Sequence, residues 1–146
     1  MEPLSKQASS WQVWKNQCLG FLNAYNEKDV PAMLSYFSED ATCHFIPLGD
    51  AGKGNVHDLG QSIWTSIIDC FPNVENTVDS IISEDGGIRA QVSIRGKQAK
   101  DFLGLPNKGL SFESGHIFVF KLSPVHNIEH IDIHWDHEDF VRQLGS

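Results

Sequence analysis

The chain has few cysteines, few basic residues and no long apolar run, and each shortage excludes a class of protein. Its 146 residues include three cysteines, which lie far apart and never form a CxxC pair. An odd, scattered set of cysteines fits a reducing compartment better than a disulfide framework. No apolar run approaches the roughly 20 residues that a membrane-spanning helix needs, so we expect no membrane partner.

The shortage of positive charge excludes another class. Eleven Lys and Arg residues stand against nineteen Asp and Glu residues, for a net charge of −8. Without a basic patch, nucleic acid is not an expected partner. The first residues, MEPLSKQASSW, lack the apolar core of a signal peptide, and we therefore expect a cytoplasmic protein.

The first half of the chain has helical periodicity. Apolar residues recur at spacings of three and four between Trp11 and Tyr25, after a possible capping box of Ser9 and Gln12, which predicts a helix that ends near Asn26. Three further elements are expected here: a short helix capped by Asp29, a strand over residues 41–47 and, after a loop, a helix over residues 56–70.

The second half has the period of two that strands show. Four strands are predicted, over residues 75–83, 88–96, 110–122 and 127–135, and a short helix over residues 138–144 follows. Gly86 and Gly87 mark a hairpin turn between the first two strands. We therefore predict one α+β domain over residues 1–146, with a pocket between the sheet and the helices.

Three segments resemble one known family. "FPNVENTV" is similar to the family's Phe-Pro entry into its sheet, Gly96 followed by "FLGLPNKGLSF" is similar to its Gly…Phe-x-Gly-x-Pro segment, and "DFVRQLG" is similar to its C-terminal Gln-Leu-Gly. On these segments the chain resembles the SnoaL-like polyketide cyclases, within the NTF2-like (nuclear transport factor 2-like) superfamily. The resemblance implies a cone-shaped α+β barrel, in which three helices pack on a curved, mainly antiparallel mixed sheet.

The resemblance also implies a function and its catalytic residues. These cyclases perform cofactor-free acid/base chemistry, such as an aldol-type cyclisation or a proton transfer, on hydrophobic polyketide-like carbonyl compounds. His116 falls where they carry a cavity histidine, and Asp132 falls where they carry the catalytic aspartate. The turn "KLSPVHN" is longer than the family's usual hairpin, and a one-residue slip would make Asp136 the substitute. Two alternatives stay open: a non-catalytic protein that binds a small hydrophobic ligand, and a steroid-isomerase-like or dehydratase-like enzyme.

The last predicted strand presents two different faces. His130, Asp132 and His134 share one face, whereas the other carries Glu129, Ile131, Ile133 and Trp135. An inward face with Asp132 favours an enzyme. An inward apolar face would instead put the histidines outside, in a subunit contact.

The remaining expectations concern ligands and partners. We expect no cofactor and no metal, because the His-x-Asp-x-His pattern of the last strand matches no familiar metal spacing, and no G-x-S-x-G nucleophile motif occurs. The expected partners are a small hydrophobic molecule and further copies of the chain, as a homodimer or higher oligomer. The predicted substrate-binding residues are Trp14, Tyr25, Phe45, Trp64, Phe102 and His130.

Overall fold

The computed structural model describes residues 2–146, with side chains described from residue 11 onward. The helices are α1 (Glu2–Asn26), α2 (Val30–Leu34), α3 (Gln61–Cys70) and α4 (His137–Gln143), with a 3₁₀ segment η1 (Ile46–Gly52) and a π-wound segment η2 (Val56–Gly60) that leads into α3. The strands are β1 (Phe37–Phe45), β2 (Lys53–Asn55), β3 (Glu75–Glu84), β4 (Gly87–Lys97), β5 (Ser111–Leu122) and β6 (Ile128–Trp135). None of the helices within residues 2–146 combines the length and apolar character that a bilayer span requires.

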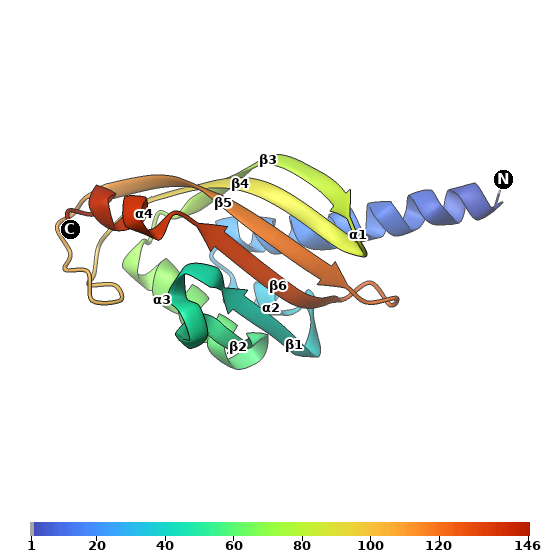
Figure 1. Ribbon diagram of the computed structural model, residues 1–146, viewed down its shortest axis with the longest axis horizontal. Coiled ribbons are helices and arrows are strands. Elements are labelled where there is room, and N and C mark those ends of the chain that lie inside the picture. Colours follow the sequence, from blue (N-terminus) through green and yellow to red (C-terminus); the bar gives the residue numbers. More distant parts are fainter. Residues whose placement is uncertain (1) are drawn as a thin grey trace.

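The strands form a single mixed sheet in the order β2-β1-β6-β5-β4-β3. β3 to β6 form an antiparallel meander, and β1 joins its end by pairing parallel to β6. The sheet is curved, and α1 lies across it (Figure 1). This architecture confirms the predicted α+β fold with a mainly antiparallel mixed sheet.

Aromatic packing joins the helices to the inner face of the sheet. The ring of Phe21 on α1 lies 5.2 Å from Trp64 on α3, 6.3 Å from Phe118 and 5.9 Å from Phe120 on β5 (centroid distances). All four side chains are buried. Burying a large apolar side chain stabilises the fold by about 1.5–3 kcal/mol, so this cluster is a major source of the sheet's attachment to the helices.

The β3–β4 hairpin confirms the turn that the sequence predicts. Its two central residues, Asp85 and Gly86, have positive φ values of 28° and 77°. Positive φ at both central positions is the geometry of a type I′ turn, whose twist matches that of the flanking strands.

One predicted detail of the first helix and one of the last strand are wrong. The first helix begins at Glu2 rather than at Ser9, whose capping hydroxyl lies outside the described side chains. The segment before Ser9 contains no helix breaker, because Pro3 falls in the first turn, where proline is tolerated. Glu129 does not share the face of Ile131: a register shift opposite Lys121 and Leu122 leaves Glu129 exposed and buries Ile128 instead.

Candidate functional site

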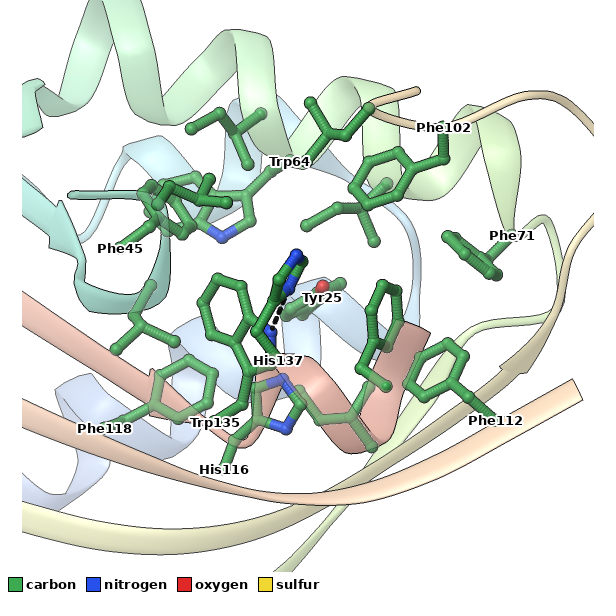
Figure 2. A pocket seen from close by; sticks show the side chains of 17 residues that line it. Tyr25, Phe45, Trp64, Phe71, Phe102, Phe112, His116, Phe118, Trp135 and His137 are labelled. Atoms are coloured by element: carbon green, nitrogen blue, oxygen red, sulfur yellow. Dashed lines mark hydrogen bonds between the residues drawn. The ribbon is translucent and has the colours of Figure 1, made fainter. Parts of the chain in front are cut away.

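A small cavity lies between the helices and the inner face of the sheet. Its volume is about 50 Å³, and Figure 2 shows the side chains around it. Polar groups enter it only from Tyr25, His116, His137 and the tryptophans, and none of the described lining residues is Asp or Glu. The lining residues are Tyr25, Phe45, Leu48, Ile63, Trp64, Ile67, Phe71, Ile94, Phe102, Leu103, Phe112, His116, Phe118, Ile133, Trp135, His137 and Phe140.

The cavity is too small for a substrate in this conformation. A volume of about 50 Å³ holds a few water molecules, whereas pockets for drug-sized ligands measure about 300–1,000 Å³. Leu103 both lines the cavity and is 56% exposed, which places an opening at the turn from Phe102 to Leu105. Two backbone hydrogen bonds between Phe102 and Leu105, of 3.0 and 2.8 Å, close this turn. A larger ligand therefore requires wall side chains or this turn to move.

His116 is placed in the cavity by the alternation of β5. Its strand partner across the sheet is Trp135, and the two rings stack with centroids 5.5 Å apart and planes 19° apart. Nδ1 lies 3.4 Å from the carbonyl oxygen of Ser114, which can only accept a hydrogen bond, and 3.3 Å from the hydroxyl oxygen of the same residue, which can donate or accept. A proton on Nδ1 satisfies both contacts, because the carbonyl and the hydroxyl oxygen can each accept from it, and in this tautomer Nε2 is a bare acceptor.

The surroundings of His116 also shift its acidity. Burial among apolar side chains lowers the pKa of His116 to about 4, and the hydrogen bond with Ser114 opposes part of that change. His116 is therefore uncharged at neutral pH. A neutral imidazole with a free Nε2 is the form that can accept a proton.

His137 enters the same cavity from the first turn of α4. The indole Nε1–H of Trp135 donates to Nδ1 of His137 at 3.2 Å, drawn as a dashed line in Figure 2. An indole N–H can only donate, so Nδ1 accepts and the proton of the neutral ring lies on Nε2. The two histidines thus differ: His116 keeps a bare Nε2, and His137 carries an N–H there.

Tyr25 adds a second donor. Its hydroxyl points into the cavity (Figure 2), and it has no hydrogen-bonding partner within residues 11–146. Burial raises the pKa of the Tyr25 phenol, so the group stays protonated. A protonated hydroxyl in an apolar cavity can donate to a ligand oxygen.

The predicted lining residues divide into two groups. Tyr25, Phe45, Trp64 and Phe102 lie in the cavity wall, and their contact with a ligand stays a prediction. Trp14 does not lie there: its Nε1 donates to Nδ1 of His126 at 2.9 Å, in the turn between β5 and β6. Trp14 and Tyr25 lie eleven positions apart, or about 16 Å along a helix. Trp14 therefore contacts the turn between β5 and β6, whereas Tyr25 lines the cavity.

Asp132 lies outside the cavity, which corrects the placement that we predicted from the sequence. Its Oδ1 accepts from Nε2 of His130 at 2.7 Å, and Nδ1 of His130 lies 2.6 Å from the hydroxyl of Thr42. The side chains of His130 and Asp132 are 28% and 29% exposed. The predicted place of His130 in the cavity is therefore wrong as well. Ile131 and Ile133, which alternate with these residues, occupy the inner face.

Asp136 also lies outside the cavity. It is exposed, and its carboxylate accepts from the backbone N–H of Asp139 at 3.0 Å, as the N-cap of α4. A capping carboxylate at this position is worth about 1 kcal/mol to the helix. Its visible role is thus to start α4, which positions His137.

The described residues contain no group of three or more His, Cys, Asp or Glu side chains arranged to hold a metal ion. The three cysteines are buried and free, and burial raises the pKa of the Cys43 thiol to about 11. Such thiols remain protonated at neutral pH, which makes them poor nucleophiles. The titratable groups among the described lining residues are His116, His137 and Tyr25.

Sequence reasoning missed His137 and Trp135 as residues of the site. Trp135 is the last residue of the last predicted strand, and His137 lies two residues beyond it, in "HWDH", where a strand gives way to a helix. The apolar face of that strand was a usable signal, because it puts Trp135 inside together with Ile131 and Ile133. The alternation of a strand does not predict where the side chain of His137 points, because this residue lies on the helix after the strand.

Comparison with known families and structures agrees with this architecture. The family model described as a SnoaL-like domain matches residues 19–122, so the chain belongs to the SnoaL-like family. The matched range ends before β6, so Trp135 and His137 lie outside it. No curated protein matches the chain.

Solved structures share the fold at low sequence identity. The proposed polyketide cyclase IdmH from Streptomyces antibioticus is 22% identical, with a TM-score of 0.76 over 91% of this chain and 99% of that one. TsrD from Streptomyces laurentii is 22% identical, with a TM-score of 0.75 over 94% and 96%. AclR from Streptomyces galilaeus, a proposed hydroxylase, is 15% identical, with a TM-score of 0.77 over 90% and 95%. At these identities the likeness shows the fold alone.

Proposed function

We propose that the protein binds a small hydrophobic carbonyl compound of polyketide type in the aromatic cavity and catalyses a cofactor-free proton transfer on it. The reaction belongs to the aldol-cyclisation or isomerisation type. The observation that carries this proposal is the pair of histidines with opposite hydrogen-bonding states, His116 and His137, facing one apolar cavity.

In the proposed reaction His116 is the base. Its bare Nε2 takes a proton from the carbon next to the ligand carbonyl, which leaves an enolate. Burial disfavours the resulting imidazolium, the same effect that lowers the pKa of His116 to about 4, and the proton returns readily to the product. A positioned general base contributes about 10²–10⁴-fold to a rate, and the low pKa of His116 places its contribution at the lower end of this range.

In the proposed reaction Tyr25 and His137 are the hydrogen-bond donors to the ligand. The Tyr25 hydroxyl and the Nε2–H of His137 donate to the carbonyl oxygen as negative charge develops on it. A donor aimed at developing charge in a water-poor site contributes about 10²–10³-fold in known enzymes. The apolar wall strengthens both interactions by excluding water.

The test uses aryl ketones, whose α-protons exchange slowly with solvent. One-, two- and three-ring ketones such as acetophenone and 1-tetralone would be offered in D₂O, with binding measured by tryptophan fluorescence and exchange by mass spectrometry. We expect binding and accelerated α-deuteration by the unaltered protein. His116→Gln, which keeps a similar volume and lacks a base, should lower the exchange rate about 100-fold.

Asp132→Asn is the matched control, because it alters a polar group on the outer face of the same sheet. Its exchange rate should stay within about twofold of the unaltered protein. Binding without exchange would identify a non-catalytic binding protein, the alternative that the lack of a carboxylate among the described lining residues favours. Failure of every ketone to bind would reject the proposal.

Two wider expectations remain predictions. Self-association through the outer sheet face draws support from Ile117 and Val119, which are only partly covered there beside Asp132 and His134. Light scattering or analytical ultracentrifugation would measure the oligomeric state. The cytoplasmic location is equally untested.

A further inference from the structure

Trp135 and His137 are brought together where the last strand turns into the last helix. β6 ends at Trp135, Asp136 caps α4, and His137 is the first helical residue. Because the cap fixes the turn between them, the indole and imidazole rings meet within the cavity, with centroids 6.0 Å apart and planes at 68°. The geometry directs the indole N–H at Nδ1 of His137, at 3.2 Å.

His137 is held from a second side. Its ring stacks on that of Phe140, one helical turn later, with centroids 5.8 Å apart and planes 25° apart. Phe140 is buried, so the stack resists rotation of the imidazole. With Nδ1 occupied by the indole, the other nitrogen of His137, Nε2, faces the cavity (Figure 2).

Trp135 also contacts the other histidine. The flat face of its indole stacks on His116 at 5.5 Å, while the polar edge of the same indole donates to His137. A single side chain therefore touches both the bare-nitrogen histidine and the N–H histidine. Removing its N–H would affect one contact and leave the ring stack in place.

We infer that Trp135 is a positioning residue that fixes His137 as the Nε2–H tautomer, so that a donor from His137 and an acceptor from His116 face one ligand. The inference rests on the proposed function for its catalytic meaning. Its structural content, the tautomer of His137, can be measured without any substrate. A mixture of tautomers would instead offer the ligand an N–H only part of the time.

The test is ¹⁵N NMR of the histidine side chains at neutral pH, with His137 assigned by its loss in His137→Gln. In the unaltered protein Nδ1 of His137 should have the chemical shift of a bare nitrogen, and Nε2 that of a protonated one. Trp135→Phe keeps a ring and removes the N–H. In this variant the difference between the two nitrogen shifts should narrow, because both tautomers become accessible.

The chain offers a matched control. Trp14 donates to Nδ1 of His126 in the same way, at 2.9 Å, but outside the cavity. Trp14→Phe should change the nitrogen shifts of His126, leave those of His137 unchanged and leave ketone exchange unchanged. A general effect of losing an indole would change His137 in both variants and would overturn the inference.

The catalytic readout separates the two proposals. Trp135→Phe should lower the α-exchange rate of a bound ketone about two- to tenfold, the range for one lost hydrogen bond, with ketone affinity within about twofold. If the tautomer is as stated and no ketone exchanges, the proposed function fails and the positioning inference stands. If exchange occurs and Trp135→Phe alters neither the shifts nor the rate, the inference alone fails.

One measurement needs no variant and covers the case in which Trp135→Phe does not fold. In the unaltered protein a proton-bearing Nδ1 on His137 would contradict the inference directly. A bare Nδ1, with the Trp135 indole N–H exchanging more slowly with solvent than that of the partly exposed Trp11, would support it.

Discussion

The two faces of β6 carry related polar groups in different surroundings. On the outer face His130 is hydrogen-bonded on both sides, by Thr42 and Asp132, and remains partly exposed. On the inner face Trp135 joins His116 and His137 in an apolar cavity. The outer group has its hydrogen bonds satisfied within the protein, whereas each inner histidine has one ring nitrogen without a hydrogen-bonding partner among the described residues. Surroundings, more than residue type, decide which histidines can do chemistry.

The largest difference between the faces should appear in stability. Phe118 and Val119 are neighbours on β5 that face opposite ways, and Phe118 is 1% exposed while Val119 is partly exposed. Phe118→Ala should lower the free energy of unfolding by about 3–5 kcal/mol, because it leaves a cavity in the core. Val119→Ala should cost about 1 kcal/mol. Urea unfolding measures both, and similar losses would show that the faces are equally buried.

The next largest effect should be the pH dependence of stability that His116 causes. The pKa of His116 is about 4 in the folded protein, below the ordinary value of about 6.5 for an unfolded chain. Between these values the unfolded chain binds the proton more strongly, so stability is fully present above pH about 6.5 and falls as the pH drops towards 4. The loss reaches up to about 3 kcal/mol, at about 1.4 kcal/mol per pKa unit.

Urea unfolding between pH 7 and pH 4 would measure that loss. His116→Gln should flatten the fall over this range, because the variant has no imidazole at the buried position. His134→Gln removes a histidine from the exposed end of the outer face and is the matched control. Equal flattening in both variants would refute the assignment to His116.

The smallest effects should come from the outer hydrogen-bonded chain. Thr42→Val removes the hydroxyl beside His130 and should change the free energy of unfolding by about 1 kcal/mol or less, because water can replace the lost contact. Ketone binding should be unchanged. A large loss of binding in Thr42→Val would show that the outer face communicates with the cavity.

Elements with a clear period could be predicted from the sequence. The helix over residues 11–26, the hairpin at residues 84–87 and the meander all follow from apolar spacing and turn residues. The boundaries of elements without a clear period were harder to predict from the sequence. β1 begins at Phe37, before the predicted residue 41, because its register shifts between Phe37 and Thr42 interrupt the alternation.

The candidate site was predictable only in part. Tyr25, Phe45 and Trp64 lie in the cavity wall because helix and strand periods orient large apolar side chains inward. Asp132 was misplaced because a motif position does not reveal which face of a strand turns inward, and a change of face moves a carboxylate from cavity to surface. His137 depends on the turn after β6, whose geometry no spacing rule describes.

The sequence by itself determined the fold class, the apolar inner surface and the family, because these depend on periodicity and on motifs that short segments carry. Only the tertiary structure decided that two histidines, and no described carboxylate, face the cavity. It also decided which ring nitrogen of His116 meets Ser114 and which ring nitrogen of His137 accepts from the indole N–H of Trp135. The physical reason is that hydrogen bonding and desolvation depend on which groups meet in space, and the cavity combines residues as far apart in the chain as Tyr25 and His137.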